Sequence, residues 1–390
     1  MTERLYYTDP YRTRFEARIL DVRGRRVVLD RTAFYPASGG QPCDFGRLGG
    51  AGVVEIAEDG EQISHLVDRE LEPGPVECEI DWPRRFDHMQ QHSGQHLLSA
   101  VFVELTGLAT VSFHLGAETS TIDLEAPQLS AAQIEAAEAR ANALVFENRP
   151  VSARLYSPEE AAGIGLRKPR EREGPIRVIE IAGCDRSACG GTHVRATGEI
   201  GPILLRRLDR VRQNARLEFV CGGRAVRQAR RDYNALSRVA QLLSAPLEQA
   251  PALLEAQVEA AKAADKARRK IETELAGFRG RELYRATAED ARGHRVCRAA
   301  EREGAVESWR ATADSFVAAG PKAVFLLTVE QPPALLLALS ADLGRHAGQI
   351  VKTAVEPLGG RGGGSARMAQ ASLPDAARLA DATARILEAL

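Results

Sequence analysis

Two short motifs of metal-binding residues constrain this chain more than any other feature. The first reads His-Ser-Gly-Gln-His and the second, far along the chain, reads Cys-Gly-Gly-Thr-His, so each places two potential ligands four residues apart. In a helix this spacing puts both side chains on one face, whereas two glycines after a cysteine favour a tight loop. Three imidazoles and one thiolate form a complete tetrahedral set for Zn²⁺. We therefore predict one zinc ion per chain, and the fold must bring together its ligands His92, His96, Cys189 and His193.

The residues around these motifs argue against two common classes of zinc enzyme. Ser93 follows the first histidine, at the position where HExxH metalloproteases carry a glutamate as general base. The sequence also lacks the PCxxC pair of the nucleotide deaminases. His88 lies four residues before His92, where it could be a competing ligand or an exposed residue. We expect it to be a hydrogen-bond partner of a ligand, because a coordinating imidazole usually has an oriented neighbour.

Composition indicates a globular protein that acts in a reducing compartment. The 390 residues are enough for two to four domains, with 44% hydrophobic and 27% charged residues. The net charge of -1 means that any nucleic-acid contact must come from local basic patches. The six cysteines are scattered and the first residues lack an apolar signal core, so we expect a cytoplasmic protein. The apolar runs are too short to span a membrane.

The pattern of apolar residues changes three times along the chain and predicts an α+β protein in four parts. Alternation over 18–29 favours a β-barrel-like N-terminal domain, and helical spacing over 87–105 favours a helix that ends near Gly107. Further on we expect a looped or disordered stretch at 168–174 and a Gly-rich loop at 359–365. The predicted parts are the β-rich domain 1–84, the α+β zinc domain 85–222, the helical hairpin arm 223–285 and the C-terminal α/β domain 286–390.

Several motifs agree, in order, with one known family. Residues 84–98 read RRFDHMQQHSGQHLL, and 189–194 read CGGTHV before a Gly-Glu-Ile-Gly segment. Residues 34–42 read FYPASGGQP, and 359–371 read GGRGGGSARMAQA. In these motifs the chain resembles the editing domain of alanyl-tRNA synthetases and its freestanding relatives, the alanyl-tRNA editing proteins. The aminoacylation core of the synthetases has no counterpart here, and Ser365-Ala366-Arg367 depart from the synthetase loop, so contacts made there are not carried over.

The resemblance implies hydrolysis of a mischarged ester, Ser-tRNA(Ala), with Gly-tRNA(Ala) as a second candidate. An apolar activation pocket rejects an added hydroxyl poorly, so a second, hydrolytic site is needed. Four protein ligands fill a tetrahedral shell, which favours a zinc ion that positions the substrate. The alternative is a zinc-stabilised tRNA-binding protein without hydrolytic activity.

Candidate pocket residues follow from the same resemblance. The predicted catalytic residues are Gln41, Gln95, His114 and Thr192, with Asp44 and Ser112 as further pocket candidates. Gly39 and Gly40 can present backbone amides to the terminal adenosine or the ester, although such a pair is also common in ordinary turns. His114 is a candidate general base; a lone histidine is more often structural or exposed.

Basic residues cluster after the second metal motif and recur near the C-terminus. We expect Arg206, Arg207 and Arg210 to contact acceptor-stem phosphates, although a solvated charged face is the simpler interpretation. Arg361 and Gly363 would contact the outer tRNA corner, and the helical arm or the C-terminal domain could also mediate a homodimer. The Gly-rich segment lacks the Gly-Lys-Ser/Thr ending of a P-loop, so no ATP binding is expected.

Overall fold

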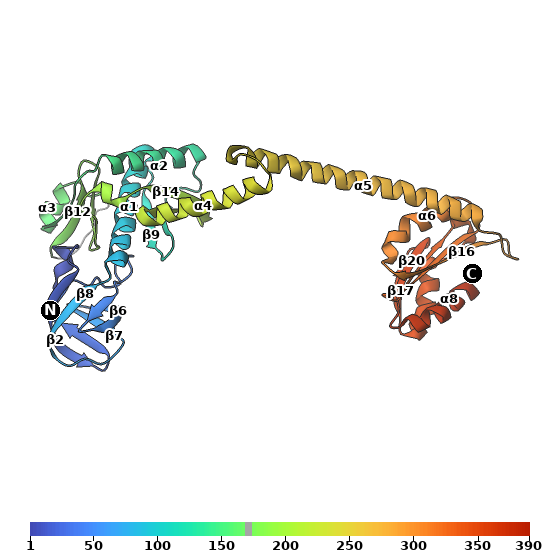
Figure 1. Cartoon of the computed structure of the whole chain (residues 1–390), viewed down its shortest axis with the longest axis horizontal. Coiled ribbons are helices and arrows are strands. Elements are labelled where there is room, and N and C mark those ends of the chain that lie inside the picture. The colour runs from blue at the N-terminus through green and yellow to red at the C-terminus, as the bar shows by residue number, and fades with distance from the viewer. Residues whose placement is uncertain (168–173) are drawn as a thin grey trace. The chain divides into compact units, whose positions relative to one another are not determined.

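The structure is a computed structural model that describes residues 1–167 and 174–390 (Figure 1). The chain is a mixed α/β protein that divides into two compact units, Met1–Val239 and Ala240–Leu390. Apart from Gly174, the loop expected at 168–174 lies outside the described residues. The division into four domains stays a prediction.

The first unit begins with a closed β-barrel. Apolar side chains alternate along its strands, and those of Phe15, Ala17 and Ile19 are buried inside it. Closure leaves no exposed strand edge. Two short segments, β1 (Glu3–Arg4) and β4 (Arg31–Thr32), pair in parallel beside it. In spatial order the barrel strands are β2 (Arg14–Arg23), β3 (Arg26–Leu29), β7 (Gln62–Val67), β6 (Ala51–Asp59), β5 (Gly46–Leu48) and β8 (Gly74–Ile80).

A long helix, α1 (Trp82–Thr106), follows the barrel and forms the centre of the first unit (Figure 1). The Asp81 side chain caps its start by accepting a hydrogen bond from the Arg84 amide, and Gly107 ends it in the left-handed conformation with φ 71°. Every residue from Gln91 to Phe102 is buried, so this stretch is enclosed on all sides. The sequence predicted its end correctly, but the helix starts earlier because a proline in the first turn is favourable.

Two antiparallel sheets pack around α1. The helix comes so close to one of them that a Cβ at Gly94 would lie 2.3 Å from Sγ of Cys221, so only glycine fits there. Helices α2 (Ala131–Phe146) and α3 (Pro158–Gly163) each begin with a serine capping box. One sheet has the order β14 (Ile203–Val211), β15 (Asn214–Cys221), β10 (Ser120–Leu124), β9 (Thr110–Leu115), and the other β11 (Val151–Tyr156), β12 (Ile176–Ile181), β13 (Asp185–Ala188).

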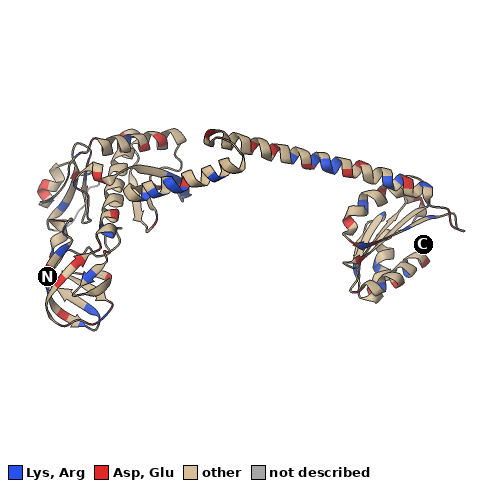
Figure 2. Cartoon of the chain, in the orientation of Figure 1, with Lys and Arg blue, Asp and Glu red and all other residues tan. Residues whose placement is uncertain are grey.

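Two helices lie where the sequence predicts a helical arm. Helix α4 (Gly222–Leu242) belongs mainly to the first unit, and α5 (Ala250–Ala286) belongs to the second. Lys and Arg are prominent on α4 and in the middle of α5 (Figure 2). Their pairing as a hairpin stays a prediction. Among the described residues, no helix is both long enough and apolar enough to cross a lipid bilayer.

The second unit is built on one five-stranded sheet with helices on both faces. Along β17 (Ala323–Gln331) the side chains of Val324 and Leu326 belong to one core, which includes residues of α7 (Ala347–Val355) and α8 (Leu379–Glu388). Those of Phe325 and Leu327 belong to the opposite core, with α6 (Arg310–Ala318) and the end of α5. The sheet order is β16 (Arg295–Glu303), β17 (Ala323–Gln331), β18 (Ala334–Leu339), β20 (Met368–Ser372) and β19 (Arg361–Gly364).

The prediction of a Gly-rich loop at 359–365 is wrong, because most of this segment forms the edge strand β19. Its glycines allow close packing. A Cβ at Gly362 would lie 2.5 Å from Cβ of Ala371 and 3.0 Å from Cγ1 of Val351 on α7. A Cβ at Gly364 would lie 2.3 Å from the carbonyl oxygen of Met368. Glycine is therefore needed here for contact between the strand and its neighbours.

Candidate metal centre

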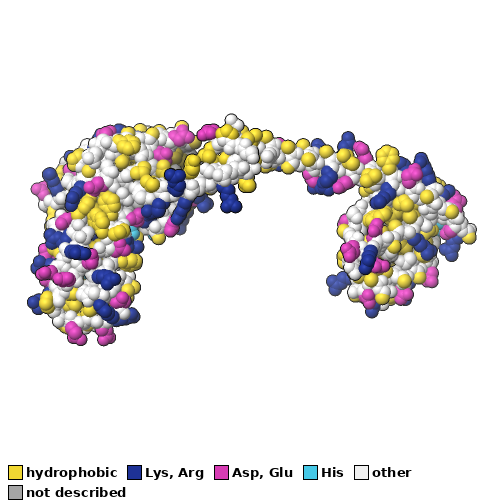
Figure 3. All heavy atoms as spheres, in the orientation of Figure 1, with side chains coloured by type: hydrophobic (Ala, Val, Ile, Leu, Met, Phe, Trp, Pro, Cys, Tyr) yellow, Lys and Arg dark blue, Asp and Glu magenta, His cyan; other side chains and the backbone are white. Residues whose placement is uncertain are grey.

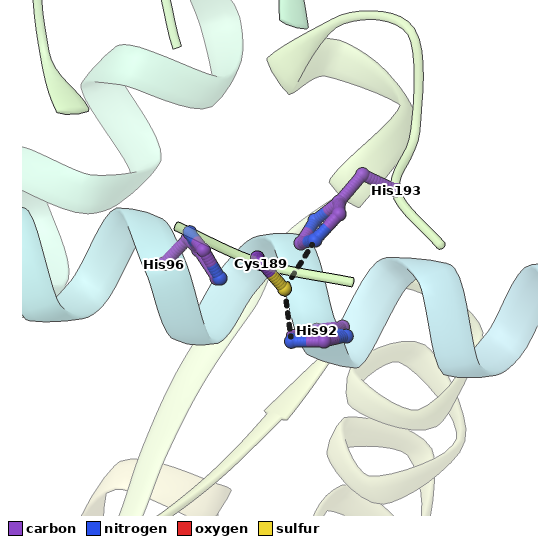
Figure 4. Close-up of side chains that lie close together, drawn as sticks. All are labelled: His92, His96, Cys189 and His193. Carbon is purple, nitrogen blue, oxygen red and sulfur yellow. Dashed lines mark hydrogen bonds between the residues drawn. The ribbon is translucent and has the colours of Figure 1, made fainter. Parts of the chain in front are cut away.

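The four predicted ligands come together inside the first unit (Figure 4). Helix α1 carries His92 and His96 on successive turns, and the loop after β13 carries Cys189 and His193. The ligand atoms all lie within 4.8 Å of one another. Sγ of Cys189 is 3.4 Å from Nε2 of His92 and 3.4 Å from Nε2 of His193. Tetrahedral zinc with ordinary bond lengths requires a sulfur–nitrogen separation of about 3.5 Å, so these distances fit the ion.

The outer nitrogen of each ligand histidine has an oxygen partner. These contacts leave Nε2 of each ring free for a metal, because the Nδ1–H is used as a donor. A ring oriented in this way is the usual arrangement around protein-bound zinc. The partners are Gln41 Oε1 for His92 at 2.8 Å, Asp185 Oδ2 for His96 at 3.2 Å and Ser93 Oγ for His193 at 3.1 Å.

Electrostatics favours a thiolate at the centre. Burial would raise the pKa of Cys189, but His92 and His193 outweigh it and hold this pKa well below its usual value. Burial together with His92 lowers the pKa of His193 to about 3, so this ring is neutral and able to coordinate. Burial opposes protonation of His96 as well, yet Asp185 and Cys189 raise its pKa to about 9. Metal binding at His96 therefore displaces a proton.

The loop that carries Cys189 and His193 is fixed by side chains from elsewhere in the unit. Nη1 of Arg177, on β12, donates to the carbonyl oxygens of Cys189 at 2.9 Å and Gly191 at 2.8 Å. Ser93 Oγ accepts a hydrogen bond from the Val194 amide at 3.1 Å. A Cβ at Gly191 would lie 2.2 Å from Cε1 of His92, so the loop passes directly against that ring. The loop geometry depends on these tertiary contacts.

A cavity of about 670 Å³ opens beside the four ligands. This volume is sufficient for an organic ligand of moderate size. Its wall includes the ligand side chains of α1 and Cys189, the barrel turn with Gly39 and Gly40, and Gln95 and Phe113. The metal centre therefore borders a cavity formed jointly by the barrel, α1 and the loop.

The structure places the predicted catalytic residues in different surroundings. Gln95 lines the cavity. Gln41 is buried against the loop, and Thr192 is buried within it. Gln41 Nε2 donates to Thr192 Oγ1 at 2.8 Å, and Gln41 Oε1 accepts from the Thr192 amide at 3.1 Å. His114 is exposed on β9 and is absent from the cavity lining.

The other pocket candidates also lie in different places. Ser112 lines the cavity and donates to Oδ2 of Asp123 at 2.6 Å, whereas the fully buried Asp44 forms an ion pair with Arg85. His88 is not part of the metal cluster, and its buried Nδ1 has no partner among the described residues. The expectation that His88 orients a ligand is wrong, because Gln41, Asp185 and Ser93 take that place.

Sequence reasoning singled out Gln41, but it missed the structural parts of Ser93, Asp185 and Arg177 at the centre. Ser93 lies inside the first motif, so its position was a usable signal. Asp185 and Arg177 reach the centre through the pairing of β12 with β13, which no local spacing reveals. These contacts depend on tertiary structure.

The predicted nucleic-acid residues carry partners of their own. Arg206 forms an ion pair with Asp232, Arg207 pairs with Asp209 at 2.8 Å, and Nε of Arg210 donates to the Arg212 carbonyl oxygen at 3.2 Å. Other Lys and Arg side chains are visible over α4 (Figure 3). In the second unit, Arg361 and Gly363 line a separate cavity of about 620 Å³.

Comparison with known protein families finds one matching family model in each unit. Residues 176–217 match the threonyl and alanyl tRNA synthetase second additional domain. Residues 307–390 match the DHHA1 domain. Among solved structures, the C-Ala domain of Aquifex aeolicus alanyl-tRNA synthetase matches 22% of this chain and 86% of that chain, at 22% identity and a TM-score of 0.20.

Curated relatives define the family more closely. Alanyl-tRNA editing protein AlaX-L of Pyrococcus horikoshii is 31% identical over 399 residues, which cover 95% of this chain and 94% of the relative. Alanyl-tRNA editing protein Aarsd1 of Mus musculus is 38% identical over 232 residues, 58% of this chain and 56% of the relative. The match thus spans little more than half of the mouse protein. The chain belongs to the family of freestanding alanyl-tRNA editing proteins, as its motifs suggested.

Proposed function

We propose that this protein is a trans-editing hydrolase that deacylates mischarged Ser-tRNA(Ala), with Gly-tRNA(Ala) as a second substrate. The observation that carries the proposal is the cluster of three histidines and one cysteine beside a 670 Å³ cavity, in a member of the alanyl-tRNA editing family. Removing serine after the charging reaction requires a second site, because an apolar activation pocket rejects an added hydroxyl weakly.

The protein groups around the cavity have distinct parts in this proposal. A zinc ion held by the four ligands would supply positive charge that orients the aminoacyl ester. Gln41 and Ser93 keep two of the ligand rings in place, and Thr192 ties its loop to Gln41. Gly39 and Gly40, at the cavity wall, would present backbone amides to the terminal adenosine or the ester. His114, exposed on β9, is less well placed for proton transfer than the groups in the cavity wall.

Binding of the tRNA would involve both units. We assign the acceptor stem to the basic side chains of β14 and α4, including Arg206, Arg207 and Arg210. Arg361 and Gly363 would contact a more distant part of tRNA(Ala), and the helical arm 223–285 or the C-terminal domain 286–390 would mediate a homodimer. The proposed activity requires a cytoplasmic location, where tRNA is charged.

A deacylation assay tests the proposal. Zinc-loaded protein is incubated with Ser-tRNA(Ala), and loss of the ester is compared with that of a Cys189→Ser variant. The exposed Gln128 provides a matched control, Gln128→Met, outside the cavity lining. We expect turnover by the wild type and the control, and none above background by Cys189→Ser. Tight tRNA binding without hydrolysis by the wild type would instead establish the zinc-stabilised binding protein.

A further inference from the structure

One buried amide in the cavity wall has an oxygen that the protein leaves unpaired. Gln95 lies on α1 directly before His96, is only 3% exposed and lines the cavity. Its Nε2 donates to Ser99 Oγ at 2.8 Å. Its Oε1 is buried and has no hydrogen-bond partner among the described residues. A buried acceptor without a partner is costly, and in a native protein it calls for an explanation.

The amide is held in a fixed orientation. Ser99 Oγ is 2.7 Å from Thr110 Oγ1, so Gln95, Ser99 and Thr110 form a chain of hydrogen bonds from α1 to the start of β9. Rotation of the amide would break its bond to Ser99, which keeps Oε1 at one position. An acceptor that is both unpaired and fixed is suited to a ligand that carries one hydrogen-bond donor.

We propose that Oε1 of Gln95 accepts a hydrogen bond from the side-chain hydroxyl of the seryl group, so that Gln95 is a specificity-determining residue. This inference rests on the proposed function. The α-ammonium group and the ester are present in correctly charged Ala-tRNA as well. An acceptor that binds either group would therefore not distinguish Ser-tRNA from Ala-tRNA. A site that hydrogen-bonds a hydroxyl rejects the analogue without it strongly, since the buried acceptor then stays unpaired. Alanyl and glycyl groups leave Oε1 in that unfavourable state.

The test measures kcat/KM for Ser-, Gly- and Ala-tRNA(Ala) with the wild type and three variants. Gln95→Met keeps the length of the side chain and removes the acceptor, and we expect the ratio of seryl to glycyl turnover to fall by about 10- to 100-fold. Gln95→Glu keeps an acceptor oxygen and should retain most of the seryl preference. Gln128→Met, the exposed control, should behave as the wild type. Zinc content and circular dichroism identify any variant that has lost the metal or the fold.

A second measurement separates this inference from the proposed function. Affinities are determined for non-hydrolysable seryl- and alanyl-adenosine amides, which report recognition even if no ester is cleaved. We expect the wild type to prefer the seryl compound by tenfold or more, and Gln95→Met or Ser99→Ala to reduce that preference. An equal loss of seryl and glycyl turnover in Gln95→Met would overturn the inference and assign Oε1 to a group common to all substrates. An unchanged ratio of the two affinities would overturn it as well.

Discussion

The two halves of the metal centre reach the same ligand spacing by opposite routes. On α1, His92 and His96 are brought together by helical periodicity within a segment in which every residue from Gln91 to Phe102 is buried. In the loop, Cys189 and His193 have no regular structure around them, and their geometry comes from Arg177, Gln41 and Ser93. The helix half is thus encoded locally, and the loop half depends on side chains supplied by other elements.

Removing one ligand from either half should have the largest effect. We expect His96→Ala and Cys189→Ala to lower zinc affinity by more than about 1000-fold and to abolish deacylation, because each takes away a metal bond. Zinc content after dialysis, together with the initial rate on Ser-tRNA(Ala), measures this. Full activity in either variant after removal of the metal would contradict a role for the centre.

The helix half should also be sensitive to acid, through His88. Burial, together with Arg84, lowers the pKa of His88 to about 4. The unfolded chain therefore binds this proton first, so stability is full above about pH 6.5 and falls as the pH drops towards 4. The loss amounts to about 3 kcal/mol. Urea unfolding of a Trp309→Phe background, in which Trp82 at the start of α1 is the remaining tryptophan, measures it. His88→Gln should make this pH dependence shallower, while the buried His65 and His193, whose pKa values are also lowered, keep a part of it; an unchanged slope would place the origin of the dependence elsewhere.

Substitutions at two adjacent glycines distinguish two reasons for glycine in the loop: lack of space for a side chain, and the need for a flexible backbone. A Cβ at Gly191 would lie 2.2 Å from the His92 ring, whereas one at Gly190 would meet its nearest atom, the Tyr7 hydroxyl oxygen, at 3.6 Å. We expect Gly191→Ala to weaken zinc binding by about 10- to 100-fold and Gly190→Ala to leave it within about twofold. Competition with a chromogenic chelator measures both affinities. Equal effects would show that backbone freedom, and not the approach to His92, is what the loop requires.

The contribution of Arg177 should be smaller, and it is specific to the loop half. Arg177→Met leaves the carbonyl oxygens of Cys189 and Gly191 without their buried donor, which costs about 1–3 kcal/mol. We expect zinc affinity to fall by about tenfold, with the total helix content of the protein unchanged in circular dichroism. Arg177→Lys, which can restore one donor, should recover part of the affinity. An unchanged zinc affinity in Arg177→Met would mean that the loop keeps its geometry without the hydrogen bonds from Arg177.

The same contrast explains what the sequence predicts well. The ligand set is readable because helical spacing and a cysteine followed by glycines are local patterns, and the structure brings all four side chains together. Gln41 appeared in the sequence as a catalytic candidate, yet it hydrogen-bonds His92, a contact across 51 positions of the chain. Asp185 gave no signal at all, because packing of β13 against α1 brings it to His96.

A glycine-rich segment led to a wrong prediction, because the same composition is typical of loops and of closely packed strands. The segment at 359–365 has the composition of a loop, but β19 needs glycine in order to lie against α7 and β20. The start of α1 lies before the range 87–105 that apolar spacing predicts, because Asp81 caps the helix and proline is acceptable in its first turn. At β19 the tertiary environment selects one of two structures that the local sequence allows.

The most direct test of the central claim is the coordination of zinc in the purified protein. Metal analysis and X-ray absorption at the zinc edge together give the stoichiometry and the ligand types. The account predicts one zinc ion per chain with three nitrogen ligands and one sulfur ligand, and loss of the sulfur shell in Cys189→Ala. Active protein that holds no zinc, or zinc bound without sulfur, would contradict it.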